Sequence, residues 1–205
     1  MWRLFRPLRY FTLRNREKIA IDILGTFALS VLIFLPFLLV PDASFFRSGG
    51  FLDRLIGLMS ALTGFFVAAL VAAATFAHPD LDAVMTSGAV EMKVKEGKKK
   101  AWQKMTRREL ACAIFGYLSF AAFTFSVAAA IVVPITTAEP SVPVFIQGEA
   151  ASFLSQHKSE LRIGLMLFFV VPLAHIMTAT GLGVFYLMER LHYRRPVIVS
   201  KSDML

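Results

Sequence analysis

Four long stretches of apolar residues, none of which contains Asp, Glu, Lys or Arg, divide the sequence. They are 18, 23, 29 and 26 residues long. A helix needs about 20 mostly apolar residues to cross the ~30 Å hydrocarbon core of a bilayer. Helices of a soluble bundle would need polar faces, which these stretches lack. The pattern therefore predicts an all-α integral membrane protein with four transmembrane helices in a single domain, residues 1–205. The predicted spans cover about residues 19–40, 55–77, 108–134 and 162–188.

The segments between the spans differ sharply in positive charge. Cytoplasmic loops of membrane proteins are enriched in Lys and Arg. Alternate segments of this chain carry 18 and 4 of its 22 Lys and Arg residues, so we expect an N-in/C-in topology. The short, turn-rich segment 41–54 predicts that spans one and two form a hairpin. The segments expected in the cytoplasm are the N-terminal segment 1–18, the loop 78–107 and the tail 189–205.

Composition agrees with a membrane protein. Of all residues, 57% are hydrophobic and only 18% are charged, and the mean hydropathy is +0.64. A soluble domain would carry roughly 25% charged residues. The first apolar stretch ends without a small-residue cleavage site, so we expect it to remain as a span. Cys112 is the only cysteine, which excludes a disulfide within the chain.

Motifs for catalysis and cofactor binding are absent from the sequence. It has no HExxH, GxSxG, Walker A or glycine-rich dinucleotide motif. We therefore expect no enzyme activity, no catalytic residue and no cofactor. The stretch HPDLD, residues 78–82, offers one His and two Asp side chains, fewer than a metal site with settled spacing needs. We expect no metal there; Pro79 should end span two, and Asp80 or Asp82 should cap a short helix.

His175 is the only ionisable side chain near the centre of any predicted span. Ionisable residues inside membranes are rare and usually functional, facing the bundle interior or water. His175 is therefore a candidate proton relay or pore residue, with Thr178 on the same helical face. The structural alternative is a neutral His175 that is hydrogen-bonded to Ser126, Thr124 or Tyr117 of span three.

Asp22 lies at the inner edge of span one, one helical turn after Lys18. A carboxylate and an ammonium group at positions i and i+4 are neighbours on a helix surface. We expect Asp22 to stay hydrated near the headgroups or to pair with Lys18. A pore-lining role is the alternative.

Small residues in span two recur at helical spacing and form one continuous face. Small side chains let helix backbones approach closely in lipid, where no hydrophobic effect drives the helices together. This face either packs within the monomer or joins protomers of a homo-oligomer, and Ser126 lies on a similar face of span three. The span-two residues of this candidate interface are Gly57, Ala61, Gly64 and Ala68.

Two basic stretches are candidates for contact with the membrane surface. The N-terminal segment alternates Arg with aromatic or apolar residues, which is typical of an amphipathic segment on an anionic surface. Each Lys or Arg near anionic lipids contributes ~1 kcal/mol to binding. A docked protein partner is an alternative, and direct nucleic-acid contact is a less favoured one. The residues expected at the membrane surface or a partner are Arg3, Arg6, Arg9, Lys98, Lys99, Lys100, Lys104, Arg107 and Arg108.

The end of the basic loop carries a helix-start signal. Thr106 and Glu109 have the spacing of a capping box, in which each side chain binds a backbone N–H group beside the other residue. Span three should therefore begin near Arg107.

Two passages carry a resemblance to a known class of proteins. AATFAHPDLD at the end of span two, followed by TRRELACAIFGYLSF, resembles small multi-span membrane proteins of bacterial phage-defence and abortive-infection operons. The resemblance implies a multi-pass protein of the bacterial inner membrane. It also implies an effector that harms the membrane when a cytoplasmic sensor protein detects infection.

Three functions suit these features. The first is a non-enzymatic effector that assembles as a homo-oligomer and permeabilises the membrane. The second is a small channel, transporter or proton-coupled accessory subunit that uses His175. The third is a membrane scaffold that recruits a cytoplasmic partner.

Overall fold

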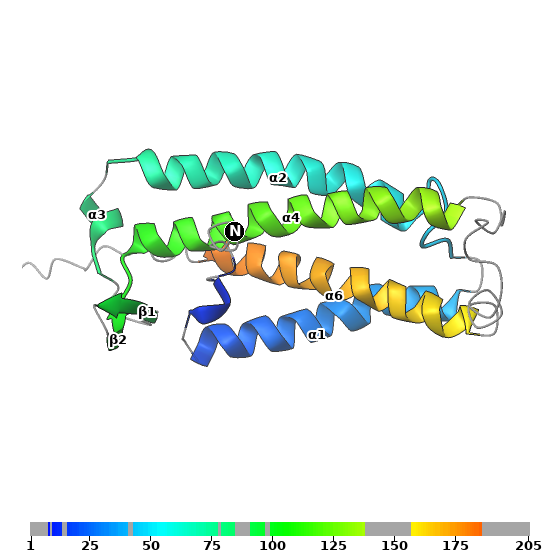
Figure 1. Ribbon diagram of the computed structural model, residues 1–205, viewed down its shortest axis with the longest axis horizontal. Coiled ribbons are helices and arrows are strands. Elements are labelled where there is room, and N and C mark those ends of the chain that lie inside the picture. The colour runs from blue at the N-terminus through cyan, green and yellow to red at the C-terminus, as the bar shows by residue number, and fades with distance from the viewer. Residues whose placement is uncertain are drawn as a thin grey trace, which may run out of the picture.

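Four long helices make up most of the protein in its computed structural model (Figure 1). Each is long and apolar enough to cross a membrane, with a mean hydropathy of 2.0 to 2.2 over its most apolar window. The prediction of four such helices is confirmed. They are α1 (Arg16–Leu39), α2 (Phe51–Thr75), α4 (Arg107–Thr137) and α6 (Lys158–Phe185). The structure describes residues 8, 10–13, 16–40, 43–77, 79–84, 91–96, 99–137 and 157–185.

The helices start earlier than the hydropathy pattern predicts. α1 begins three residues before the predicted span, and α2 and α6 each begin four residues before it. The added turns contain charged residues such as Asp53 and Glu160 in the first turns of α2 and α6, where carboxylates interact favourably with the helix dipole. A helix can continue beyond the hydrocarbon. Charged residues therefore mark the membrane edge better than the end of the helix does.

The four helices form a row in the order α2, α4, α6, α1 (Figure 1). α2 packs against α4, α4 against α6, and α6 against α1. Among the described residues, α1 and α2 do not pack along their lengths. Phe37 of α1 contacts Phe51 at the start of α2, with ring centroids 5.1 Å apart, and Phe45 of the connection at 5.0 Å. The predicted hairpin of spans one and two is therefore wrong. Phe45 in the turn between them is fully buried and belongs to the same hydrophobic core as the long helices.

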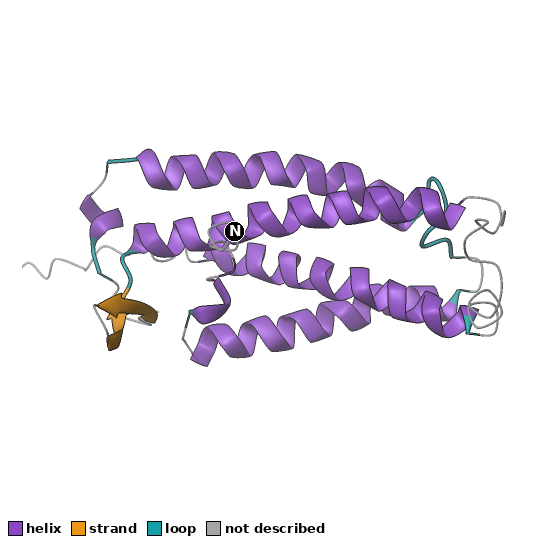
Figure 2. Ribbon diagram, viewed as in Figure 1, coloured by secondary structure: helices purple, strands orange, loops and turns teal. Residues whose placement is uncertain are grey.

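A small two-stranded β-hairpin lies at one end of the bundle (Figure 2). We call this end of the bundle the hairpin end. Strands β1 (Glu91–Glu96) and β2 (Lys99–Lys104) pair antiparallel, and a short helix, α3 (Pro79–Asp82), precedes them. The prediction of helices holds for the four spans, whereas the loop 78–107 contains strands that we did not predict. The stretch EMKVKE alternates apolar and charged residues with the period of a strand, but its lysines suggested a solvated loop.

Two glycines mark the close helix contacts. A Cβ atom at Gly25 of α1 would lie 2.8 Å from Cγ2 of Thr178 on α6. A Cβ atom at Gly183 of α6 would lie 3.0 Å from a methyl carbon of Ile114 on α4. Because only glycine leaves room for these approaches, α6 packs tightly against both of its neighbours.

Gly25→Ala should destabilise the protein by roughly 1–3 kcal/mol, because the new methyl group overpacks the α1–α6 contact. Thr178 cannot easily turn away, since its hydroxyl donates to the Ala174 carbonyl at 2.9 Å. Thermal unfolding in detergent micelles would measure the loss. Thr178→Ser, which deletes the clashing methyl group, should restore stability in the Gly25→Ala protein. Gly57→Ala is the control, because no described atom lies within 4 Å of its new methyl group. Equal losses in the two alanine variants would contradict the close contact.

Candidate functional site

A line of polar side chains runs along one face of α1. Lys18, Asp22, Thr26 and Ser30 recur every fourth residue, a spacing that places them on one side of a helix. All four line a groove of about 920 Å³ between α1 and α6, and His175 lies on its α6 wall. The other lining residues are mostly apolar. We call this arrangement the polar seam.

An ion pair lies at the hairpin end of the polar seam. Nζ of Lys18 is 2.8 Å from Oδ2 of Asp22, and the two residues are only 3% and 9% exposed. The Tyr10 hydroxyl donates to both carboxylate oxygens at 3.0 and 3.1 Å. The predicted pairing is confirmed, but the predicted hydration of Asp22 is wrong. Tyr10 covers the pair, and its hydrogen bonds compensate the carboxylate for the water it has lost.

His175 reaches across to α1. Its Nδ1 atom lies 3.1 Å from Oγ1 of Thr26. The expected partners on span three do not bind it: Thr124 donates to its own helix, and Ser126 has no hydrogen-bond partner among the described residues. Tyr117 contacts only the ring of His175, at a centroid distance of 5.6 Å. His175 therefore joins α6 to α1, because the seam supplies a hydroxyl group at its depth.

Aromatic rings of the N-terminal segment close the polar seam. The Phe11 ring stacks on His175 with centroids 5.4 Å apart, and Tyr10 stacks on Tyr117 at 4.6 Å. Tyr10 is fully buried and Leu13 is 2% exposed. Tyr10 and Leu13 therefore pack into the bundle, whereas Phe11 stays 60% exposed, and this corrects the prediction that the whole segment 1–18 lies on the membrane surface.

The small-residue face of α2 points away from the bundle. Gly57, Ala61, Gly64 and Ala68 are all exposed, and a Cβ atom at either glycine would meet no described atom within 4 Å. The opposite face packs on α4 through large side chains, including Met59. The prediction that the small-residue face packs within the monomer is therefore wrong, because bulky residues supply the hydrophobic contact with α4.

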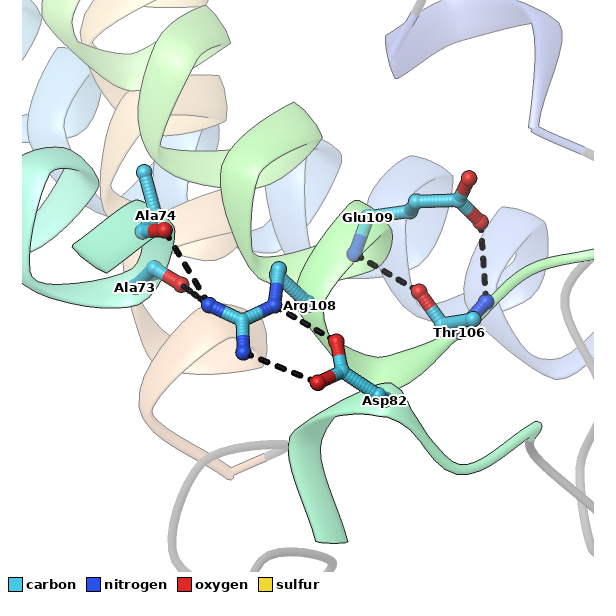
Figure 3. Close-up of polar contacts among 6 residues, drawn as sticks. All are labelled: Ala73, Ala74, Asp82, Thr106, Arg108 and Glu109. Carbon is cyan, nitrogen blue, oxygen red and sulfur yellow. Dashed lines mark hydrogen bonds and ion pairs between the residues drawn. The ribbon is translucent and has the colours of Figure 1, made fainter. Parts of the chain in front are cut away.

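Arg108 holds the end of α2 (Figure 3). Its guanidinium binds both carboxylate oxygens of Asp82 at 2.7 and 3.1 Å. It also donates to the backbone carbonyls of Ala73 and Ala74, both at 3.1 Å. Carbonyls in the last turn of a helix lack partners within that helix, so Arg108 caps α2 from α4. We call this set of contacts the arginine clamp, and it replaces the expected role of Arg108 at the membrane surface.

The start of α4 has the predicted capping box (Figure 3). The Thr106 backbone N–H donates to Glu109 at 3.0 Å, and the Glu109 N–H donates to the Thr106 hydroxyl at 3.2 Å. α4 begins at Arg107 as expected. Asp82, in contrast, lies at the last position of α3 and binds Arg108, so the prediction that it caps a short helix is wrong.

The other predicted basic contacts are only partly described. Lys99, Lys100 and Lys104 belong to β2, and Lys104 is exposed. Arg107 is half-buried in the first turn of α4. The remaining predicted residues lie outside the described residues: Arg3, Arg6, Arg9 and Lys98.

Sequence reasoning missed two members of the polar seam, Thr26 and Ser30, and also Tyr10, which binds Asp22. The repeat of polar residues at positions 18, 22, 26 and 30 was readable in the sequence, and it corrects the statement that span one has no polar face. Tyr10 had no such signal, because it belongs to a segment outside the regular helix.

Within the described part of the chain, no group of three or more His, Cys, Asp or Glu side chains could hold a metal ion. His78 and the side chain of Asp80 lie outside that part. No family model, curated protein or solved structure matches this chain.

The arginine clamp should make stability depend on the ionisation of Asp82. The hydrogen bond from Arg108 lowers the pKa of Asp82 below its ordinary value of 3.8. A carboxyl group with a lowered pKa stabilises the fold above its ordinary pKa and loses that contribution as the pH falls through the folded value. Asp82→Asn should therefore lower Tm at neutral pH, and its difference from the unaltered protein should shrink below pH 3.8.

Arg108→Lys should lower Tm further, because a lysine cannot bind the carboxylate with a planar fork and reach two carbonyls at once. Arg107→Lys is the matched control at the neighbouring position and should change Tm little. A constant difference between the Asp82→Asn and unaltered proteins at every pH would contradict the role of this carboxylate.

Proposed function

We propose that this protein is a non-enzymatic membrane effector. Copies of the chain associate within the bilayer and perturb or permeabilise it when a cytoplasmic partner signals to the hairpin end. The observation that supports this function best is the exposed small-residue face of α2. A helix face that lipid alone contacts has no need of repeated glycines and alanines, whereas a second helix packs most closely against such a face.

The arginine clamp supports a route from the partner to the membrane. Arg108 joins the end of α2, the start of α4 and Asp82 of α3. The strands β1 and β2 lie next to this point, with an isolated antiparallel bridge between Val84 and Thr106. A protein that binds β1 and β2 therefore lies next to the contacts that hold the end of α2, the helix that carries the self-association face.

The proposed orientation puts the hairpin end in the cytoplasm and both termini on the same side. The charge asymmetry of 18 against 4 Lys and Arg residues favours this orientation. The resemblance to phage-defence effectors favours the bacterial inner membrane and a cytoplasmic sensor protein as the partner. Anionic lipids suit the net charge of +8.

Expression in bacteria would test the effector function. The unaltered protein should slow growth and depolarise the membrane, either on overexpression or on phage infection with its companion genes. Gly57→Leu combined with Gly64→Leu should weaken association by about tenfold or more, equivalent to 1.4 kcal/mol, and depolarisation should fall accordingly. The variant monomer should still fold, since no described atom lies within 4 Å of a Cβ atom at either position.

Val67→Phe is the matched control, since it enlarges a side chain that is 44% exposed on the same helix outside the small-residue face. A voltage-sensitive dye and chemical crosslinking would report potential and assembly at equal protein levels. Normal growth and an unchanged potential under both conditions would contradict an effector. Full activity of the leucine variant would contradict association through α2.

A second function, a proton-coupled channel or transporter subunit, is favoured by the polar seam. Titratable groups from three elements surround His175: Tyr10 of the N-terminal segment, Lys18 and Asp22 of α1, and Tyr117 of α4. Proton relays inside membranes need such neighbouring titratable groups. The sequence alone had shown His175 without a second titratable residue at similar depth.

Proton flux into proteoliposomes would test this second function. His175→Ala should reduce the flux by about tenfold or more if His175 relays the proton, in line with the size of general acid–base effects. Assembly measured by crosslinking should not change. Ser126→Ala alters a buried hydroxyl group outside the groove and is the control. An unchanged flux in His175→Ala would contradict the relay.

A further inference from the structure

The register of β1 and β2 sorts the lysines of the hairpin onto one face. Residues directly opposite each other in an antiparallel pair share a face of the sheet, and successive residues alternate between the two faces. One face therefore carries four lysines and one glutamate, a net charge of +3, whereas the other carries one lysine and one glutamate and is neutral. We call the first one the lysine face. Its residues are Glu91, Lys93, Lys95, Lys100, Trp102 and Lys104.

Two lysines of this face occupy directly opposite positions. Lys95 pairs with Lys100 in the register, whereas the other two charged pairs of the hairpin each join a glutamate to a lysine. Like charges directly opposite across two strands destabilise a sheet. An anion against this face relieves the repulsion, and phosphate groups are the anions that lysines commonly bind in proteins. The register therefore points to a ligand that carries phosphate groups.

The lysine face is held beside the edge of the membrane. Only Met105 and Thr106 separate β2 from α4, so the hairpin lies at the end of the bundle where α4 begins (Figure 1). Met105 is 2% exposed, and Thr106 forms an antiparallel bridge with Val84. The apolar stretch of α4 starts at Leu110, within one helical turn of Arg107. Because the helices are already inserted, contact between this face and lipid headgroups is intramolecular, which raises the effective concentration of the headgroups.

Trp102 gives the lysine face the aromatic residue that membrane interfaces favour. Its side chain is 44% exposed, and Lys104 on the same face is exposed as well. Tryptophan is enriched at the membrane–water interface, where its ring meets apolar groups and its N–H group meets water. A nucleic acid also binds lysines and stacks on aromatic rings. The bilayer is favoured over it, because only the bilayer lies at a fixed, short distance from this face.

We propose that the lysine face binds the phosphate groups of anionic phospholipids in the leaflet beside the hairpin. With the hairpin end in the cytoplasm, as in the function proposed above, this is the cytoplasmic leaflet, whose anionic lipids attract basic residues next to transmembrane helices. The lysines bind headgroup phosphates, and Trp102 lies between the headgroups and the hydrocarbon. A cytoplasmic partner that needs this face has to compete with the lipid for it.

Quenching of Trp102 fluorescence would test this proposal. Trp2→Phe makes Trp102 the only tryptophan of the full-length protein. This protein would be placed in nanodiscs of phosphatidylcholine, with or without phosphatidylglycerol, in which some acyl chains carry bromine near the headgroup. Phosphatidylglycerol should increase the quenching by bromine, and salt at about 1 M should reverse the increase, because the screening length falls to about 3 Å. Quenching that is independent of phosphatidylglycerol would contradict the proposal.

Lys100→Gln and Lys99→Gln form a matched pair, since the two lysines are neighbours in β2 that lie on opposite faces. Lys100→Gln should lower the equilibrium constant for attachment, taken from the quenched fraction, about fivefold, the equivalent of ~1 kcal/mol per lysine. The hairpin should stay folded, because this change also removes the repulsion from Lys95. Lys99→Gln should leave attachment unchanged. Equal effects of the two variants would overturn the assignment of the lysine face.

A single-stranded RNA oligonucleotide would distinguish lipid from nucleic acid. Added to the phosphatidylglycerol nanodiscs at an equal concentration of phosphate, it should leave the quenching of Trp102 unchanged. Loss of quenching would mean that the lysine face prefers nucleic acid to lipid, and the proposal would be wrong. Failure in any of these assays leaves the effector function standing, because they contain neither a partner protein nor a membrane potential.

Discussion

The buried ion pair between Lys18 and Asp22 decides where α1 lies. Charges in hydrocarbon are tolerated only when they are paired and hydrogen-bonded. Here the third partner is the hydroxyl group of Tyr10, so the chain before α1 has to turn back into the bundle. Tyr10 in turn stacks on Tyr117 of α4. α1 is thereby tied to the α4–α6 side of the bundle, and not to α2, its neighbour in the sequence.

The order of the helices follows from this constraint. With α1 held against α6, α2 packs mainly on α4, and its small-residue face stays uncovered. The arginine clamp fixes α2 at the hairpin end, because Arg108 supplies the hydrogen bonds that the last carbonyls of α2 lack. α2 is thus fixed along one face and at one end, and the remaining face is the surface that the proposed self-association uses.

Hydropathy and local motifs predicted the elements but not their partners. The four helices follow from apolar length, and the start of α4 follows from Thr106 and Glu109, because both signals act within a few residues. The partner of His175 depends on which helix lies opposite, and periodicity reveals only the face on which a residue lies. The same limit applies to Gly57: a small residue shows that a helix can approach closely there, whereas the close contact inside the monomer occurs at Gly25.

α1, which carries the polar seam, and α2, which carries the small-residue face, lie at opposite ends of the helix row (Figure 1). α1 and α6 enclose the groove at one end, whereas α2 stands at the other, with α4 between them. A second copy that packs on α2 therefore leaves the groove between α1 and α6 uncovered. α4 contacts both sides: it carries Arg108 at the clamp and Tyr117 at the seam. α4 is therefore the helix that packs both on α6, which lines the groove, and on α2, which carries the association face.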